Sequence, residues 1–269
     1  MSERPPVPRR TEISGAIGEH IHVSAPYEDL ARRLGLTSPR WAFEDPRIEV
    51  WRCIAERENG VLDAEGTRLH VKRDQPGRRA VADEARGLAL LAAAGIGSAP
   101  LVAHGRLADG RSFLVTEHLH GFEDAERLLE RGVPFERLAP ATALLAATLH
   151  RARLHHRDLY VGHFWARLDD ATPNEPTLRL IDAARVRPLP RVLARRWIVK
   201  DLGQFVYSIE RFDASGGARR AWLERYASAS GAPLTPRLEA AIQRRAQRIA
   251  RSAARSARRD PTRNHPIDR

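Results

Sequence analysis

Alternation of apolar and polar residues predicts an antiparallel sheet in the first half of the chain. Residues 67–74, TRLHVKRD, alternate in this way, as does a strand with one buried face. Residues 48–56, IEVWRCIAE, predict another strand of this sheet, and the turn signal Asn59-Gly60 separates the two segments. Residues 112–119, SFLVTEHL, are apolar until the polar end of the segment and predict a further strand.

Apolar residues recur at helical spacing in the intervening segment and in most of the second half. The segment 80–97, AVADEARGLALLAAAGIG, predicts a helix that stops at the two glycines near its end. The long Ala- and Leu-rich pattern from 135 to 150 predicts a buried helix, and further helices are predicted at 196–212 and 218–230. Between them, TLRLIDAARV (177–186) predicts a strand with an acidic residue at its end.

The order of these elements predicts an α+β protein with two lobes. Strands come first, helices follow, and acidic loops fall where the two halves join. We expect residues 1–47 to form a partly ordered N-terminal extension with one helical stretch and residues 48–118 to form a small antiparallel-sheet lobe. Residues 119–230 would form a larger helical lobe, and residues 231–269 a basic helical tail.

Composition agrees with a globular protein without identifying its function. The 269 residues are enough for a two-lobed fold with a sizeable core, and 42% of them are hydrophobic. The Pro- and Arg-rich first ten residues are followed by no apolar run, so they do not predict a secretory signal. The longest apolar run, 88–103, is interrupted by glycine and proline and falls short of the roughly 20 residues of a membrane span. The single cysteine, Cys53, excludes an intrachain disulfide and fits a reducing cytoplasm.

Net charge is the first property that points to a class of partner. A charge of +11 and a pI near 11.0 favour anionic partners such as nucleic acid, phospholipid headgroups or phosphorylated substrates. Of the 45 basic residues, only Lys72 and Lys200 are lysines. A lysine in so arginine-rich a chain is a candidate for a position that a guanidinium cannot fill.

Four residues occur in the order that protein-kinase-like phosphoryl transfer needs. This chemistry uses a strand lysine that binds the α- and β-phosphates of ATP and a helix glutamate that holds the lysine. It also uses one aspartate to orient the accepting hydroxyl and a second for Mg²⁺. Lys72 lies in a predicted strand, and Glu84 follows twelve residues later in a predicted helix. Asp158 lies in HHRDLYVGHF (155–164) after the long helix, and Asp182 ends the strand LRLID. Each residue alone is a weak signal, because a surface position explains it equally well, but together they favour a kinase-like enzyme.

The segments HHRDLYVGHF, LRLIDAARVR and RRWIVKDLGQFVYS resemble the lipopolysaccharide kinase family, the bacterial heptose and Kdo kinases of the inner core. The resemblance runs from about residue 48 to residue 230 and is most specific between 155 and 208. It implies a protein-kinase-like fold, ATP as donor, Mg²⁺, and a core sugar hydroxyl as acceptor. The matching positions are His156, Arg157, Asp158, Tyr160, His163, Phe164, Asp182, Arg185, Lys200 and Asp201.

The resemblance also implies roles for individual residues. Asp158 would position and deprotonate the acceptor hydroxyl, and Asp182 would hold Mg²⁺. Lys72, held by Glu84, would bind the ATP phosphates. The remaining expected roles are adenine contacts by the backbone of Glu117 and Leu119, support of the catalytic loop by His156 and Asp201, and acceptor contacts by Arg185, Arg187 and Tyr160.

Two departures from protein kinases bear on the metal and the substrate. His163 stands five residues after Asp158, where protein kinases carry a magnesium-binding Asn, and the resembling family has histidine there. Because Mg²⁺ prefers oxygen ligands, His163 is a weaker candidate ligand than Asp182. Contact with a phosphate, support of Asp158 and a satisfied core position are the alternatives. Tyr160 replaces the lysine of Ser/Thr kinases, and only seventeen residues separate Asp182 from Lys200; both facts argue against a protein substrate.

The expected function is transfer of the γ-phosphoryl group of ATP to a heptose or Kdo hydroxyl at the cytoplasmic face of the inner membrane. The arginines of the tail would adsorb to an anionic membrane surface. Nucleic acid is a less suitable partner, because the aromatic residues that base stacking needs are missing from the tail. Two alternatives stay open: a kinase of another small molecule or of protein, and a pseudokinase scaffold that binds lipid or a partner.

Overall fold

The computed structural model describes residues 10–14, 18–169, 176–212 and 216–259. Contacts between residues divide the chain into two compact units. Unit 1 comprises Met1–Ala89 and Ala99–His120, and unit 2 comprises Leu90–Ser98 and Gly121–Arg269. The first nine and last ten residues, which end the expected extension and tail, lie outside the described residues.

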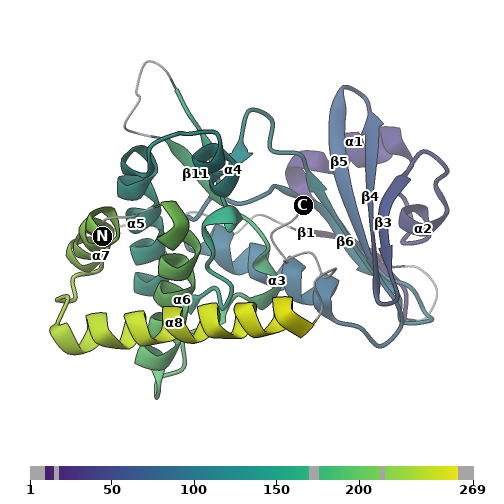
Figure 1. Ribbon diagram of the computed structural model, residues 1–269. Coiled ribbons are helices and arrows are strands. Elements are labelled where there is room, and N and C mark those ends of the chain that lie inside the picture. The colour runs from purple at the N-terminus through teal and green to yellow at the C-terminus, as the bar shows by residue number, and fades with distance from the viewer. Residues whose placement is uncertain (1–9, 15–17, 170–175, 213–215, 260–269) are drawn as a thin grey trace, which may run out of the picture. The chain divides into compact units, whose positions relative to one another are not determined.

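Unit 1 is built on a seven-stranded antiparallel sheet with the strand order β1-β2-β6-β7-β5-β4-β3 (Figure 1). The alternating segment 67–74 forms β5, which lies between β4 and β7. Lys72 of β5 pairs with Asn59 of β4 and Leu114 of β7. The strands are β1 (Arg10–Ser14), β2 (His20–Ser24), β3 (Glu49–Ile54), β4 (Arg57–Ala64), β5 (Thr67–Asp74), β6 (Leu101–Arg106) and β7 (Ser112–Glu117).

The segment expected to be an extension contributes to the core of unit 1. Strand β2 adds HIHVS to the sheet beside β6, and its two alternating apolar residues, Ile21 and Val23, are buried. After the short helix η1 (Ala25–Tyr27), helix α1 (Glu28–Leu34) and helix α2 (Trp41–Glu44) pack against the same core. The Trp41 indole donates a hydrogen bond to the Leu34 carbonyl at 3.1 Å. Burial of these apolar side chains explains why the segment folds with the unit.

Helix α3 (Ala80–Ala93) follows β5 and presents one buried face. The Asp74 carboxylate accepts a hydrogen bond from the Val81 backbone N–H at 2.7 Å and satisfies a donor of the first turn. The helix ends before Gly95, whose φ of +70° suits glycine. Glu84, the expected partner of Lys72, lies on the buried face and is 4% exposed.

Unit 2 consists mainly of helices with short strands between them. The helices are α4 (Ala125–Glu130), α5 (Phe135–Arg151), α6 (Ala194–Ile209), α7 (Gly217–Ser230) and α8 (Pro236–Arg259), with short helices η2 (Val161–His163), η3 (Ala183–Arg185) and η4 (Glu210–Phe212). The strands are β8 (Glu123–Asp124), β9 (Leu154–His155), β10 (Phe164–Arg167), β11 (Thr177–Leu180) and β12 (Arg187–Pro188). Strands β11, β10 and β8 form one small sheet, and β12 pairs with β9.

The core of unit 2 is centred on stacked aromatic rings. Phe205 of α6 and Trp222 of α7 stack with ring centroids 4.1 Å apart. The Trp222 indole donates a hydrogen bond to the Thr142 hydroxyl of α5 at 3.0 Å, so the buried polar atom is satisfied. Small residues at Ala143 and Ala146 of α5 are fully buried. These contacts make α5, α6 and α7 one packed body that supports the loops between them.

Helix α8, the described part of the expected basic tail, packs against α6 (Figure 1). Ile242 and Ala246 are buried at this contact, and a Cβ atom added to Gly203 of α6 would lie 2.5 Å from Cγ of Arg245. The glycine therefore permits the close approach of the two helices. The remaining arginines of α8 from Arg244 to Arg259 are exposed. Among the described residues no helix is both long enough and apolar enough to cross a membrane.

Candidate active site

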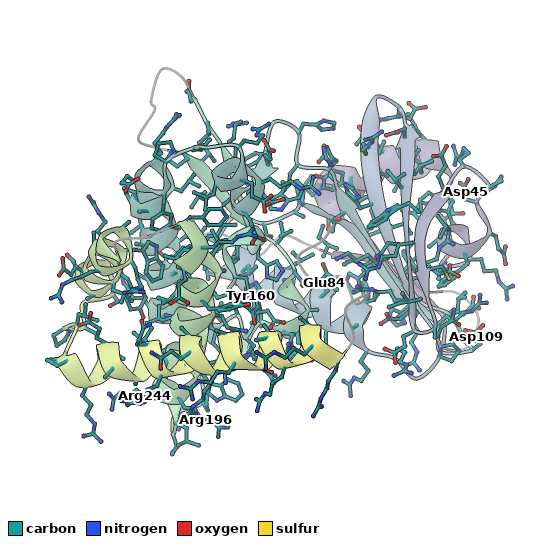
Figure 2. All side chains as sticks on the ribbon, in the orientation of Figure 1. Asp45, Glu84, Asp109, Tyr160, Arg196 and Arg244 are labelled. Atoms are coloured by element: carbon teal, nitrogen blue, oxygen red, sulfur yellow. The ribbon has the colours of Figure 1, made fainter. Side chains whose placement is uncertain are left out.

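Unit 1 holds a lysine whose ammonium group is fixed by a buried carboxylate. Lys72 Nζ lies 2.7 Å from Oε1 and 2.9 Å from Oε2 of Glu84 (Figure 2 labels Glu84 on α3). The side chains are 24% and 6% exposed, respectively. A strand lysine and a helix glutamate twelve residues apart in sequence are thus brought together. The pair leaves a compact, oriented cation on the sheet, as a phosphate-binding lysine requires.

The strand next to Lys72 carries a second feature that suits a polar ligand. Asn59, directly opposite Lys72 in the register, is 7% exposed, and its Oδ1 has no hydrogen-bond partner among the described residues. At the following position, a Cβ atom on Gly60 would lie 2.7 Å from Ile48. Glycine therefore lets β3 and β4 approach closely beside the lysine.

The segment expected to contact adenine has one donor left over. The Glu117 backbone N–H donates to the Pro100 carbonyl at 2.9 Å, so this donor is already used. The N–H of Leu119 makes no hydrogen bond within the described part of the chain, although the residue is 7% exposed. Tyr27 of the N-terminal segment donates its hydroxyl proton to the Glu117 carboxylate. Burial and this carboxylate raise the pKa of the Tyr27 phenol well above its usual value.

In unit 2, helix α6 holds the backbone of the loop that contains Asp158. The fully buried Asp201 carboxylate accepts hydrogen bonds from the backbone N–H groups of His156 at 2.7 Å and Arg157 at 2.8 Å. Arg157 has a left-handed backbone with φ +72°, and its carbonyl accepts a hydrogen bond from the Lys200 ammonium. Two consecutive residues of α6 therefore fix an uncommon backbone conformation just before Asp158.

Burial and neighbouring groups shift the pKa values of the residues that hold this loop, namely Asp201, Lys200 and His156. Burial raises the pKa of the Asp201 carboxyl, but the His150 hydrogen bond, the nearby histidines and the backbone N–H groups more than offset it, and the pKa is below its usual value. Burial lowers the pKa of Lys200 to about 8. Burial and the neighbouring His163 lower the pKa of His156, whose Nε2 lies 3.0 Å from the Ile181 carbonyl.

The Asp158 carboxylate is held by two side chains. Arg185 Nη1 donates to both carboxylate oxygens, at 3.0 and 2.7 Å, and Gln204 Nε2 donates to Oδ1 at 3.2 Å. The side chain of Asp158 is 18% exposed and that of Arg185 is 52% exposed. Arg185, expected to contact the acceptor, therefore lies against the expected catalytic carboxylate. The contacts orient Asp158 and leave the guanidinium open to solvent on its other side.

His163 lies between the two aspartates. Its Nδ1 is 2.6 Å from the Asp158 backbone carbonyl, and its Nε2 is 3.7 Å from Oδ2 of Asp182. A carbonyl oxygen can only accept, so Nδ1 carries the proton of this hydrogen bond. The Nε2 atom and the Asp182 carboxylate are therefore close enough to act on the same cation.

The metal expectation can be compared with the ligands present. Asp182 adopts a left-handed backbone with φ +56° and supplies a carboxylate of the type that Mg²⁺ binds. Within the described ranges, no group of three or more His, Cys, Asp or Glu residues is arranged to hold a metal ion. A site with one or two protein ligands still fits Mg²⁺, which commonly takes its other ligands from substrate phosphates and water.

The structure separates Arg187 from the other expected acceptor contacts. Arg187 Nη1 donates to the backbone carbonyls of Ala184 at 3.1 Å and Val186 at 2.7 Å, so it braces its own loop. Tyr160, labelled in Figure 2, instead lies in the group around Asp158. Burial raises the pKa of the Tyr160 phenol, against the effects of its hydrogen bond with Gln204 and the charges of Arg245 and Arg185.

Two residues of this group were not expected from the sequence. Gln204 contacts Asp158 directly, and Arg245 of α8 acts on Tyr160 through its charge. Arg245 has a buried Nε without a hydrogen-bond partner in the described residues. The one signal in the sequence is Gly203, because a glycine inside a helix lowers its stability and suggests a close contact. Nothing in the sequence identifies α8 as the contacting element.

Comparisons with known proteins identify the family and the fold of the chain. A family model described as the lipopolysaccharide kinase (Kdo/WaaP) family matches residues 65–226. A solved structure of WaaP in complex with acyl carrier protein is 24% identical, covers 82% of this chain and 97% of that chain, and has a TM-score of 0.67. An aminoglycoside-3'-phosphotransferase of type VIII is 18% identical over 80% of this chain and 97% of that chain, with a TM-score of 0.49. No curated protein sequence matches the chain significantly. The likeness to WaaP confirms the expected α+β, protein-kinase-like fold.

Proposed function

Because the chain belongs to the lipopolysaccharide kinase (Kdo/WaaP) family, we propose that it transfers the γ-phosphoryl group of ATP to a heptose or Kdo hydroxyl of the lipopolysaccharide inner core. One observation carries the proposal at the level of the site. The Asp158 carboxylate is held by Arg185 and Gln204 on a loop whose backbone is fixed by Asp201. An oriented carboxylate on a rigid loop is what a kinase uses to position the accepting hydroxyl.

Unit 1 would bind ATP. The Lys72 ammonium, oriented by Glu84, would neutralise charge on the α- and β-phosphates. The Leu119 N–H, which makes no hydrogen bond within the described residues, and the Glu117 carbonyl would hydrogen-bond the adenine edge. In unit 2, Asp182, with His163 beside it, would hold Mg²⁺, whose charge would offset that of the transferred phosphoryl group.

Unit 2 would act on the acceptor. As the sugar oxygen attacks the γ-phosphorus, the bond from that phosphorus to the β-γ bridging oxygen breaks and ADP leaves. Asp158 accepts the proton of the hydroxyl, and Gln204 keeps the carboxylate aimed at it. Arg185, half exposed beside Asp158, is suited to contact anionic groups of the acceptor. Arg245 near Tyr160, whose Nε has no hydrogen-bond partner among the described residues, is a second cation for this purpose.

The proposal is tested by the products of the reaction. Purified full-length protein should phosphorylate delipidated inner-core oligosaccharide in the presence of Mg-ATP, and mass spectrometry should show one added phosphate on a heptose or Kdo residue. Core oligosaccharide from a strain that lacks the gene should miss the same phosphate. Phosphorylation of other small molecules or of protein, but not of the core, would identify a different acceptor. Absence of any stabilisation by Mg-ATP would favour the pseudokinase scaffold.

We also propose that the protein works at the cytoplasmic face of the inner membrane and adsorbs there through α8. Replacing four exposed arginines of this helix by alanine should lower binding to phosphatidylglycerol vesicles, by about 1 kcal/mol per residue in contact with the surface. Co-sedimentation at two salt concentrations measures the effect, which should shrink as salt rises. The four positions are Arg244, Arg248, Arg251 and Arg255.

Substitution is preferable to truncation for this test, because Ile242 and Ala246 anchor α8 in unit 2. Four exposed, ion-paired arginines of unit 1 provide a control with the same change of net charge: Arg32, Arg33, Arg68 and Arg86. Equal loss in both variants would show that net charge, not α8, drives adsorption. Because WaaP has been solved with acyl carrier protein, co-purification with that protein is a further partner test.

Lys72→Arg is expected to lower ATP-dependent phosphorylation nearly as much as Lys72→Ala. Both oxygens of the buried Glu84 carboxylate contact the compact ammonium, and the larger planar guanidinium cannot keep both contacts and reach the phosphates. Steady-state phosphorylation and ATP affinity measure the loss. Arg52→Ala, on the exposed edge strand β3, serves as a control. Retention of most of the activity by Lys72→Arg would rule out the phosphate-binding role.

His163→Asn is expected to retain substantial activity, and His163→Ala should lose more. An asparagine amide can donate to the Asp158 carbonyl and present an oxygen toward Asp182, whereas alanine leaves the carbonyl without its partner. ATP affinity with and without Mg²⁺ should be measured beside acceptor phosphorylation. An inactive His163→Asn enzyme would point to a proton-transfer or phosphate-contact role that only an imidazole fills.

A further inference from the structure

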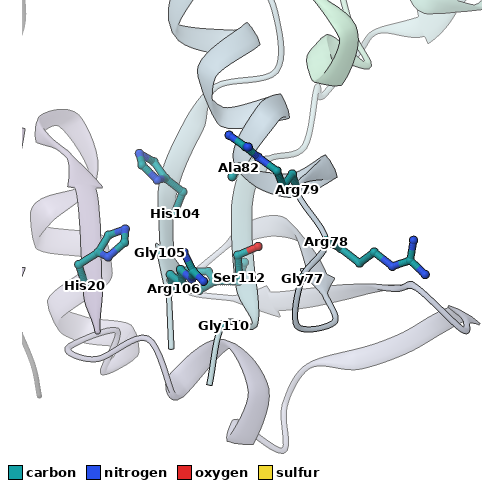
Figure 3. A pocket seen from close by; sticks show the side chains of 11 residues that line it. His20, Gly77, Arg78, Arg79, Ala82, His104, Gly105, Arg106, Gly110 and Ser112 are labelled. Carbon is teal, nitrogen blue, oxygen red and sulfur yellow. The ribbon is translucent and has the colours of Figure 1, made fainter. Parts of the chain in front are cut away.

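Unit 1 contains a pocket with a volume of about 500 Å³ that none of the roles above uses (Figure 3). It is lined by β2, β6, β7 and the segment that leads into α3. Three arginines and two histidines are among the eleven lining residues: Arg78, Arg79, Arg106, His20 and His104. None of the eleven, all of them described residues, is acidic. The pocket therefore offers a concentration of positive charge to an anion.

A buried hydroxyl in the pocket has no partner. Ser112 is 5% exposed, and its Oγ makes no hydrogen bond among the described residues. Ser112 lies opposite Arg106 in the β6–β7 register, so the two side chains project from the same face of the sheet. An unsatisfied buried hydroxyl is costly, and a ligand oxygen that accepts its proton would remove that cost.

Two of the three guanidinium groups are available for a ligand. The guanidinium groups of Arg79 and Arg106 form no hydrogen bond or ion pair with any described residue. Arg78 differs, because it pairs with Glu56 at 2.9 Å, and in Figure 3 its side chain points away from the other labelled side chains. The charges of Arg79 and Arg106 are thus not neutralised by the described residues of the unit.

Acidic residues close to the pocket in sequence are engaged elsewhere. Asp83 of α3 bonds Arg86 at 3.2 Å, and Asp109 bonds Arg111 at 2.8 Å. The Asp74 carboxylate accepts the Val81 N–H. None of these carboxylates lines the pocket, so they do not occupy the place of an anionic ligand.

We propose that this pocket binds a phosphate group, carried by a soluble phosphate ester or by a phospholipid headgroup. Arg79 and Arg106 would bind the phosphate oxygens, for which a guanidinium fork is suited, and the Ser112 hydroxyl would donate a third hydrogen bond. Gly105 shapes the floor, since a Cβ atom there would lie 2.4 Å from the His20 carbonyl and 2.7 Å from the Phe113 ring. The proposal does not depend on the proposed kinase activity.

The test measures binding of inorganic phosphate, the probe, to the full chain by isothermal titration calorimetry. Arg79→Ala and Arg106→Ala should each weaken phosphate binding by about tenfold or more, because each removes a charge-assisted hydrogen bond. Ser112→Ala should weaken binding severalfold without lowering the thermal stability of the ligand-free protein, since it removes an unsatisfied hydroxyl. Arg78→Ala is the matched control and should bind phosphate as the wild type does, because its guanidinium is paired with Glu56.

The Lys72→Ala variant distinguishes phosphate binding in this pocket from phosphate binding at the proposed ATP site. Phosphate binding in the pocket should survive Lys72→Ala. The proposal is overturned if Lys72→Ala abolishes phosphate binding while the combined Arg79→Ala, Arg106→Ala variant retains it. It is also overturned if that combined variant binds both phosphate and phosphatidylglycerol vesicles as tightly as Arg78→Ala does.

Vesicles distinguish the two sources of phosphate. Loss of binding to phosphatidylglycerol vesicles by the combined variant, relative to Arg78→Ala, would identify a lipid headgroup as the ligand. Loss of inorganic phosphate binding with unchanged vesicle binding would identify a soluble phosphate ester. Phosphatidylcholine vesicles provide the baseline for adsorption that does not need an anionic surface.

Discussion

Asp158→Ala is expected to lower phosphoryl transfer about a thousandfold while leaving ATP affinity unchanged. The carboxylate is proposed to accept the hydroxyl proton and to orient the acceptor, and general-base catalysis alone contributes roughly 10²- to 10⁴-fold. The fold should tolerate the change. Asp158 forms an ion pair with Arg185, whose side chain is 52% exposed. Ion pairs with a solvent-exposed partner contribute little to stability.

Single-turnover phosphorylation of core oligosaccharide and equilibrium ATP binding measure the two quantities separately. Gln204→Ala is an informative companion, because it removes one contact to Asp158 and leaves the carboxylate in place. It should lower the rate moderately. An Asp158→Ala enzyme with normal turnover would refute the proposed mechanism, whereas joint loss of ATP affinity and turnover would indicate that Asp158 acts on the nucleotide.

Asp201→Ala is expected to destabilise unit 2 by on the order of 3 kcal/mol. The substitution leaves two backbone N–H groups, of His156 and Arg157, without an acceptor in a buried site, and each such group costs about 1 to 3 kcal/mol. The Nε2 atom of His150, at 3.4 Å from the carboxylate, also loses its partner, while Nδ1 keeps its contact with the Tyr226 hydroxyl. The midpoint and slope of urea unfolding measure the change. Asp63→Ala removes an exposed surface ion pair with Arg68 and should produce no measurable shift.

Asp201→Asn separates charge from hydrogen bonding, since an amide keeps one acceptor oxygen. The pKa of Asp201 in the folded chain lies below its ordinary value of 3.8. The charged form is therefore favoured by folding, and its contribution to stability is present above that ordinary value. It is lost as the pH falls through the folded-state pKa. The stability difference between wild type and Asp201→Asn should shrink on acidification, and a difference that grows in acid would contradict this assignment.

The sequence predicted the sheet and helices of the two units well where periodicity is strong. The segment 67–74 forms a strand with those bounds, and the helix expected at 218–230 begins one residue earlier. The N-terminal segment was expected to be an extension because residues 1–47 are rich in proline and arginine. Its place in the sheet depends on pairing with β6, about 80 residues away, which local patterns do not report.

The candidate site was predictable to the extent that it follows sequence order. Lys72 and Glu84 are placed by adjacent elements, and the order of Asp158 and Asp182 follows the family pattern. The Arg185–Asp158 ion pair joins residues 27 positions apart through side-chain conformations, which a sequence does not encode locally. Arg245 reaches the group only because α8 crosses α6 at Gly203, a choice made by packing of the whole unit.

Because the chain has only two lysines, reagents that react with primary amines have few target side chains on it. Apart from the α-amino group, the side chains of Lys72 and Lys200 are the only primary amines. Both residues are proposed to serve phosphoryl transfer. With a pKa of about 8, Lys200 holds about a tenth of its side chains as free amine at pH 7, far more than an ordinary lysine. An acylating reagent should therefore modify Lys200, at the loop that carries Asp158, faster than Lys72, whose Nζ is bonded to both oxygens of Glu84. Amine coupling to a sensor surface or a cross-linker will accordingly act on these positions before any other side chain.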